Sequence, residues 1–188
     1  MRKYLFIVIA LCLFVFQACR NSQPSGYRGM PKEYNLCYEE IYGRCYDSIP
    51  YAVVALDLYS EGLELDEEHH MRGTGYNLYI SDIFVPERTT ADSLRLAVGE
   101  YKSDTTGEPF TFLPGRNWEG TPSGMYLLNI ENDQLLHIQV LDSGYMTVRD
   151  TTNGLKDVKF TLYYRNTYGY RATYETHFQG AFIPWQKK

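Results

Sequence analysis

The sequence predicts an all-β domain, an antiparallel β-sandwich or barrel of about nine or ten strands, which follows an N-terminal signal helix and a linker. Several stretches alternate apolar and polar residues with a period of two, as half-buried strands do. Clusters of Gly, Pro, Asn, Asp and Ser separate these stretches at short intervals. Eighteen tyrosines and nine phenylalanines suit strands, and beyond the signal no run of a dozen residues has a helical period.

The first 18 residues are predicted to be an export signal. Met1 to Lys3 give a positive start, and the thirteen residues Tyr4 to Phe16 carry no charge. A helix of that length is about 20 Å long, whereas a membrane-spanning helix must cross about 30 Å of hydrocarbon. The stretch therefore indicates a signal peptide. Phe16 is too bulky for the −3 position of an ordinary secretory cleavage site before Cys19.

The four residues Phe16, Gln17, Ala18 and Cys19 resemble the lipobox of bacterial lipoproteins, in which a large apolar, a variable and a small residue precede a cysteine. The resemblance implies that Cys19 is linked to diacylglycerol, becomes the mature N-terminus and receives a further acyl chain such as palmitate. Phe16 and Gln17 depart from the usual residues of the motif. Two or more acyl chains anchor a protein stably, so the mature chain is expected on a membrane without a transmembrane segment.

The residues after Cys19 bear on the location. In bacterial lipoproteins an aspartate after the cysteine favours the inner membrane, and this chain has Arg20, so the resemblance implies the outer membrane. Lipoproteins exported to the cell surface tend to carry acidic residues there, whereas RNSQ is neutral to basic. A periplasm-facing position is expected.

The organisation expected after the signal is a lipid-anchored linker, residues 19–35, and a single β-domain, residues 36–188. The linker is rich in Gly, Pro, Ser and polar residues and has no apolar period. Arg2 and Lys3 leave with the signal, so the formal net charge of −5 becomes two units more negative. An acidic chain without basic runs argues against binding to nucleic acid.

The clearest strands are centred on residues 54–59, 136–141 and 158–164, where Val, Leu, Ile and Phe alternate with other residues. Further strands are expected at 76–85, 94–101, 108–113, 124–130, 145–150, 169–176 and 178–183. Asp142-Ser143-Gly144 lies between two alternating runs and predicts a tight hairpin turn.

Cys37 and Cys45 remain after Cys12 leaves with the signal and Cys19 is acylated. In an oxidising compartment they form either a disulfide, worth about 2–3 kcal/mol by the loop-entropy model, or two buried thiols, and the sequence leaves both alternatives open. There is no C-x-x-C and no Cys/His zinc spacing, so no metal is expected. No cofactor is expected either.

The candidate ligand-binding residues are Arg116, Asn117, Trp118 and Glu119, in the glycine-rich loop GRNWEGTPSG. A flat indole can cover the C–H face of a sugar while polar neighbours meet its hydroxyls. The alternative is that Trp118 folds back to plug one end of the domain. The loop Asp66 to His70 holds carboxylates and imidazoles, but adjacent strand residues point to opposite faces, which favours a solvated hairpin loop.

Tyr163, Tyr164, Tyr168, Tyr170 and Tyr174 crowd one expected hairpin. They either form an aromatic face for a glycan or a protein or, as strand residues commonly do, pack across strands and in the core.

The order of strands and turns from residue 54 to 182, with LAVGEYKS, FTFLPG, TPSGMYLL and HFQGAF, resembles the small β-rich lipoproteins of gut Bacteroidota. That resemblance supplies no catalytic residues. The chain has no G-x-S-x-G, H-E-x-x-H, P-loop or dinucleotide fingerprint, so enzymatic activity is not favoured. The expected function is a non-enzymatic binding or structural module of an envelope lipoprotein, for carbohydrate or an envelope partner protein. The alternatives are a lipocalin-like barrel for a small apolar ligand and a jelly-roll hydrolase.

Overall fold

The computed structural model describes residues 29–66, 70–86, 95–115, 121–165 and 168–185. The chain divides into two units, Met1–Met30 and Pro31–Lys188, and every described strand belongs to the second. The predicted signal, the lipobox and Cys19 lie outside the described residues. Within the described part of the chain, no helix is both long enough and apolar enough to cross a membrane.

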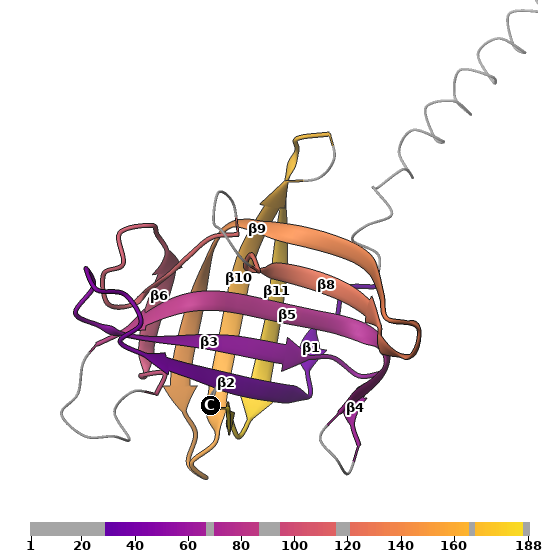
Figure 1. Cartoon of the computed structure of the whole chain (residues 1–188), viewed down its shortest axis with the longest axis horizontal. Coiled ribbons are helices and arrows are strands. Elements are labelled where there is room, and N and C mark those ends of the chain that lie inside the picture. The colour runs from indigo at the N-terminus through magenta and orange to yellow at the C-terminus, as the bar shows by residue number, and fades with distance from the viewer. Residues whose placement is uncertain (1–28, 67–69, 87–94, 116–120, 166–167, 186–188) are drawn as a thin grey trace, which may run out of the picture. The chain divides into compact units, whose positions relative to one another are not determined.

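The described residues form twelve strands in a mixed sheet (Figure 1). The strands are β1 (Glu33–Tyr34), β2 (Leu36–Gly43), β3 (Ala52–Tyr59), β4 (Leu63–Leu65), β5 (Met71–Val85), β6 (Gly99–Ser103), β7 (Thr111–Phe112), β8 (Gly124–Asn129), β9 (Gln134–Asp150), β10 (Lys156–Arg165), β11 (Arg171–Gly180) and β12 (Ile183–Trp185). The all-β prediction is confirmed. The sheet is not purely antiparallel, because β1 with β11, β12 with β2 and β6 with β7 pair in parallel.

The strands lie in two groups that β9 joins. Figure 1 shows β2, β3, β5 and β8 running across the front of β10 and β11. The first part of β9 pairs with β8, from Gln134 to Val140, and its last part pairs with β10 and β6. Both groups bury one face against the other, so the alternating apolar residues of each group meet in a common core.

The expected hairpin turn at Asp142-Ser143-Gly144 is wrong, because β9 continues through it. The register between β9 and β10 shifts there, so that Tyr163 pairs with Ser143 while Tyr164 pairs with Leu141. Such a bulge bends a strand without ending it. A Cβ on Gly144 would lie 2.8 Å from the Leu162 side chain, so the glycine permits a close approach of β10 and is no turn residue.

The core contains the apolar residues that the alternation predicts in 54–59 and 158–164, but not those predicted in 136–141, where Leu136 and Ile138 are 49 % and 38 % exposed. Leu56 and Leu58 of β3 are fully buried, and so are Val158 and Leu162 of β10. Large aromatic side chains are prominent in the core, each less than 2 % exposed: Tyr101, Tyr164, Phe84, Phe112, Phe160 and Phe178.

Strand β2, LCYEEIYG, was not among the expected strands, since two adjacent glutamates interrupt its pattern. It is held by an antiparallel ladder with β3 and buries Cys37 and Glu39 on one side. Strand β1 pairs with β11 at Glu33, within the stretch expected as linker.

Cys37 and Cys45 are free thiols in this structure, the first buried and the second exposed. The chain between them runs along β2 from Cys37 to Gly43, six residue steps of about 3.3 Å each. That separation exceeds the roughly 7 Å between Cα atoms that a disulfide can bridge. Of the two alternatives that the sequence left open, the structure therefore has unbonded thiols, although only Cys37 is buried.

Candidate functional site

The outward face of β2 and β3 carries tyrosines and carboxylates. Because side chains alternate along a strand, Tyr38, Glu40 and Tyr42 share one face of β2, opposite the buried Cys37 and Glu39. The antiparallel register places Tyr38 directly beside Asp57 of β3. The next antiparallel ladder continues this row to β5, where Asp57 pairs with Tyr79 and Tyr59 with Asn77.

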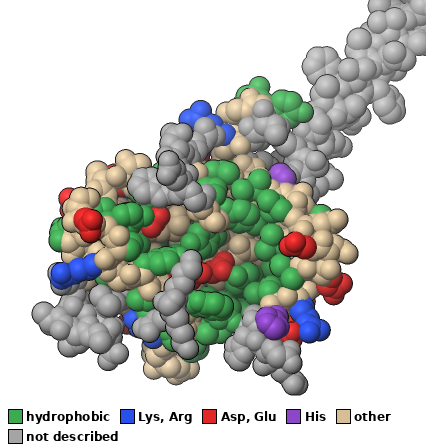
Figure 2. Space-filling model, in the orientation of Figure 1, with side chains coloured by type: hydrophobic (Ala, Val, Ile, Leu, Met, Phe, Trp, Pro, Cys, Tyr) green, Lys and Arg blue, Asp and Glu red, His purple; other side chains and the backbone are tan. Residues whose placement is uncertain are grey.

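This face contains a groove of about 400 Å³, which we call the acidic groove. Its lining includes two carboxylates and four ring side chains: Glu40, Asp57, Tyr38, Tyr59, His70 and Trp185. Met71 and Ile130 add apolar surface. Figure 2 shows hydrophobic side chains, tyrosines included, gathered over β2, β3, β5 and β8, with acidic side chains among them.

The aromatic walls of the groove are fixed by contacts with one another. The ring of Tyr38 meets that of Tyr59 edge to face, with centroids 6.0 Å apart. It meets the indole of Trp185 in the same way at 5.9 Å. Strand β12 holds Trp185 here by pairing it with Glu40 of β2. Half of the Trp185 side chain is exposed, so an apolar surface remains available to a ligand.

Asp57 is the most perturbed carboxyl group of the groove. Burial raises its pKa to about 6, hydrogen bonds from Tyr59 and Asn77 partly offset this, and the charge of Glu40 adds to the rise. The Tyr59 hydroxyl donates to Oδ2, and the Asn77 side-chain amide donates to Oδ1. A carboxylate offers about four lone-pair sites, so the anchored group can still accept hydrogen bonds from a ligand.

The phenols around the carboxylates are neutral donors. Burial is the main cause that raises the pKa of Tyr59 well above its ordinary value, and the charge of Asp57 contributes. Burial likewise raises the pKa of Tyr42, whose hydroxyl donates to Glu40 and lies 3.3 Å from that of Tyr79. Both carboxylates are therefore held in place by hydroxyl or amide groups.

The two carboxylates of the groove have no Lys or Arg partner within the described part of the chain. Among the residues that the structure describes, no lysine or arginine forms an ion pair with Glu40 or Asp57. The same residues contain no group of three or more His, Cys, Asp or Glu side chains placed to hold a metal ion.

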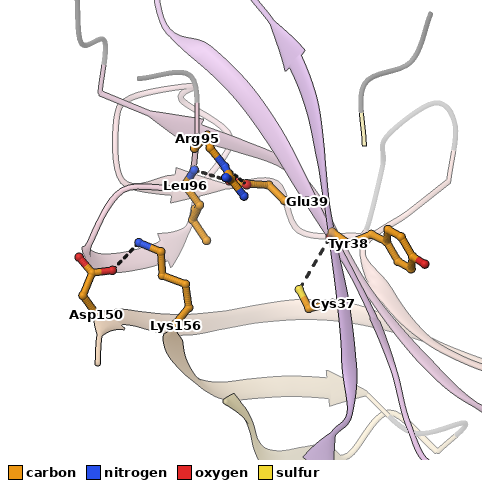
Figure 3. A network of polar contacts seen from close by, with 7 residues as sticks. All are labelled: Cys37, Tyr38, Glu39, Arg95, Leu96, Asp150 and Lys156. Atoms are coloured by element: carbon orange, nitrogen blue, oxygen red, sulfur yellow. Dashed lines mark hydrogen bonds and ion pairs between the residues drawn. The ribbon is translucent and has the colours of Figure 1, made fainter. Parts of the chain in front are cut away.

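A second cleft, of about 660 Å³, lies on the other side of β2, and we call it the Glu39 cleft. Glu39 is fully buried, and its carboxylate accepts from the Arg95 Nε at 2.6 Å and from the Leu96 N–H at 2.5 Å. Figure 3 shows Tyr38 pointing away from this network, and Lys156 reaching Asp150 at 2.5 Å.

The two clefts differ in how their charges are balanced. In the Glu39 cleft each of the two carboxylates already has a cationic partner from the same chain. Its contacts hold the segment after residue 94 against β2. The acidic groove has two carboxylates with neutral donors alone, and it is the better candidate for ligand binding.

The candidate residues from the sequence, Arg116, Asn117, Trp118 and Glu119, lie outside the described residues. The structure does place the start of their loop: the Gly115 N–H donates to the Leu141 carbonyl at 2.9 Å. A role for Trp118 in sugar stacking stays a prediction.

The two ends of the loop 66–70 are described, and they form a hairpin connection between β4 and β5. The Asp66 carboxylate accepts from the His70 N–H at 2.8 Å and from the Arg72 Nε at 2.8 Å. Residues 67–69, including His69, lie outside the described residues. His70 itself contributes to the acidic groove.

The tyrosines of the expected hairpin do not form one face. Tyr164 and Tyr174 are buried, whereas Tyr168 and Tyr170 are 75 % and 72 % exposed. Tyr163 lies under the Arg171 guanidinium, whose carbon is 3.9 Å from the ring centroid. For Tyr164 and Tyr174 the core alternative is confirmed.

The sequence does hold a signal for the acidic groove. Tyr38, Glu40 and Tyr42 alternate at period two, as do Asp57 and Tyr59. Tyrosines and carboxylates that alternate on two successive strands can bind a ligand from the solvent side. The pairing of β2 with β3 has to be known, however, before these residues can be placed in one site. The sequence does not place Trp185 beside these residues, because β12 is distant from β2 in the sequence and meets it only through strand pairing.

No protein-family model matches the chain, and neither a curated protein nor a solved structure matches it.

Proposed function

We propose that the protein is an outer-membrane lipoprotein, anchored through acyl chains on Cys19, whose β-domain is a non-enzymatic module that binds carbohydrate in the acidic groove. The periplasm-facing orientation proposed from the residues after Cys19 is part of this proposal. The single observation that carries the binding function is the groove itself, with an exposed indole and two tyrosines beside two fixed carboxylates.

The groove has the two kinds of surface that a sugar requires. A pyranose presents an apolar C–H face, and the indole of Trp185 offers a flat surface that can cover it. The hydroxyls of a sugar need strong acceptors, and ionised carboxylates form stronger hydrogen bonds than neutral acceptors do. A site with a few polar groups in an apolar, aromatic lining is the usual form of a small-molecule pocket.

Binding is favoured over hydrolysis by the way the carboxylates are held. A general acid has to be protonated and free to donate to the leaving group. Both oxygens of Asp57 accept hydrogen bonds from the protein, and Glu40 accepts one from Tyr42. Accepted hydrogen bonds favour the ionised form of both carboxylates, whereas hydrolysis needs one protonated acid and one base. The hydrolase is therefore the weaker alternative.

The lipocalin-like alternative requires an apolar cavity between the strand groups. The core of the described residues instead includes six aromatic side chains that are less than 2 % exposed. A ligand on the outward face is therefore preferred to one in the interior.

We infer in addition that the sheet is a flattened barrel. Strand β1 pairs with β11, and β2, which follows after Asn35 alone, pairs with β3. The Asn35 N–H donates to the Tyr59 carbonyl at 2.9 Å, which continues the ladder across the junction. One almost continuous segment thus links the two strand groups at the side opposite β9, as closure requires.

The test is a glycan array with the fragment 20–188, which retains every described strand, followed by titration of the glycans that bind. The variant Trp185→Ala is expected to lose about 5- to 30-fold in affinity, because a stacked ring contributes about 1–2 kcal/mol. Tyr170→Ala removes an exposed ring on another strand connection and serves as the control. Equal binding by Trp185→Ala contradicts the groove, and loss of binding in Trp118→Ala alone would place the site in the 115–124 loop.

A further inference from the structure

We propose that the acidic groove selects a saccharide that carries a protonated amine, so that the ligand's ammonium group lies between the carboxylates of Glu40 and Asp57. This inference rests on the proposed carbohydrate-binding function and names the chemical class of its ligand.

The first argument is the charge of the groove. Glu40 and Asp57 line the same groove, and Glu40 lies two residues along β2 from Tyr38, the residue that pairs with Asp57, so the two carboxylates are diagonal neighbours on one face of the ladder. The two groups are close enough that the charge of Glu40 disfavours ionisation of Asp57. Two like charges in a partly buried site repel each other, and a cation from the ligand would relieve both the repulsion and the desolvation.

The second argument is that, among the described residues, no lysine or arginine pairs with Glu40 or Asp57. Arg72, the neighbour of Met71 in the lining, is paired with Asp66, and His70 of the lining lies 3.7 Å from the same carboxylate. The groups that do contact the two carboxylates are hydroxyl and amide donors. The site is thus built to hold the carboxylates in position while leaving their charge uncompensated.

The third argument is the aromatic lining. The ring of Tyr38 is inclined by 80° to that of Trp185 and by 79° to that of Tyr59, and of these rings Trp185 is half exposed whereas Tyr38 is buried. Cations are attracted to aromatic ring faces, and most strongly to that of tryptophan. Aromatic rings beside carboxylates provide a better site for an ammonium group than for a neutral acetamide.

The test uses the full chain, purified in detergent, and three β-1,4-linked tetrasaccharides that differ at carbon 2 of each ring: those of glucosamine, N-acetylglucosamine and glucose. Spermidine serves as a cation without a sugar. Calorimetric titration at pH 7.0 is expected to show the glucosamine tetramer binding at least ~10-fold more tightly than the other two, since charge-assisted and cation–π contacts together exceed about 1.4 kcal/mol.

The decisive variant is Glu40→Gln with Asp57→Asn, which keeps the shape of the groove and removes its charge. It is expected to bring the three tetrasaccharides within about 2-fold of each other, because the charge-assisted contacts are gone. The matched control, Glu100→Gln with Glu175→Gln, removes two charges from exposed positions on β6 and β11 and is expected to retain the preference. Circular dichroism of both variants reports whether each is folded.

The outcomes separate the two proposals. Binding of the neutral tetrasaccharides as tightly as that of glucosamine overturns the ammonium inference and leaves the sugar-binding function standing. Binding of spermidine with none of the tetrasaccharides supports a cation site and overturns the sugar. A preference for glucosamine that survives in the Glu40→Gln, Asp57→Asn variant overturns the assignment to these carboxylates, and a lack of binding to all four probes overturns both proposals.

Discussion

The carboxylate of Asp57 lies in the acidic groove at a cost to the stability of the fold. Burial raises its pKa to about 6, against an ordinary value near 4. Between these two values the folded chain holds a proton that the unfolded chain has lost. The free energy of unfolding therefore falls as the pH rises from about 4 to about 6, and this contribution is constant above that window. An energetic cost of this kind is typical of functional sites.

Asp57→Asn is expected to stabilise the protein above pH 6. The ionised carboxylate costs about 3 kcal/mol there, from a shift of about two units, and the amide loses about 1 kcal/mol because one oxygen acceptor becomes a donor. The net gain is about 2 kcal/mol at pH 7.5, and near pH 4, where the ionisation cost is absent, the variant is expected to be about 1 kcal/mol less stable than the wild type. Urea unfolding at both pH values measures it. A variant that is less stable than wild type at pH 7.5 would contradict the cost assigned to Asp57.

The pH dependence of stability that Asp57 causes must be distinguished from that caused by the other groups that line the groove. Glu40, His70 and the hydroxyls of Tyr38 and Tyr59 share the lining with Asp57. Glu40→Gln and His70→Gln, measured over the same pH range, identify their contributions. The slope between pH 4 and 6 is assigned to Asp57 when Asp57→Asn removes it and His70→Gln does not.

The two thiols are expected to differ in reactivity. In the fragment 20–188, a thiol reagent should label one cysteine, Cys45, under native conditions and both after unfolding without reductant, because Cys37 is fully buried. Burial and the charge of Asp82 raise the pKa of Cys45, so labelling should be slower than that of a free cysteine at pH 7 and accelerate at higher pH. Labelling that requires a reductant would indicate the disulfide.

At the scale of elements, the period-two pattern predicts strands well where one face is uniformly apolar. The strands β3 and β10 meet that condition, and their apolar positions are the buried ones. The pattern fails in β2, where the buried side includes Glu39, whose charge is satisfied by Arg95 56 positions away. It also fails at Asp142-Ser143-Gly144, since the same three residues suit a tight turn or a bulge, and the pairing with β10 decides between them.

The site is harder to predict than the fold, because its residues come from segments that only pairing brings together. Tyr38, Asp57 and Trp185 lie on β2, β3 and β12, and the parallel pairing of β12 with β2 has no local signal in the sequence. A glycine-rich loop with a tryptophan can be recognised in the sequence without knowledge of the pairing, which is why Trp118 is a candidate from the sequence alone. The alternation of tyrosine and carboxylate in β2 and β3 was the overlooked local signal.

The ion pair of Glu39 and Arg95 predicts an asymmetric mutational effect. Arg95→Ala leaves a fully buried carboxylate without its cation and is expected to cost about 3 kcal/mol of stability. Glu39→Gln leaves Arg95, which is 41 % exposed, in contact with water, so its expected cost is smaller, about 1 kcal/mol. Urea unfolding of both single variants and the double variant gives these values. A larger cost for Glu39→Gln than for Arg95→Ala would contradict this assignment.

At the scale of the whole molecule, the fold and the proposed anchor fit together. Pro31 and Lys32 are already bonded to β11, since their carbonyls accept from the Thr176 hydroxyl and the His177 N–H, so 11 residues, 20–30, separate Cys19 from the domain. A flexible chain of that length has a root-mean-square span of roughly 20 Å. Such a tether would let the domain turn freely above a membrane, and a groove formed entirely within residues 38–185 needs no contribution from the tether.

The anchor gives the last prediction. Cys19→Ala removes the thiol that would carry the acyl chains, and two or more chains are needed for stable membrane binding. In cells that express the full chain, the wild type is expected in the membrane fraction and to incorporate a labelled fatty acid, whereas Cys19→Ala should incorporate none and leave the membrane. Cys45→Ala removes an exposed thiol of the domain and serves as the control. Labelling that persists in Cys19→Ala, or a mature N-terminus at another residue, would contradict the lipoprotein proposal while leaving the groove and its ligand tests unaffected.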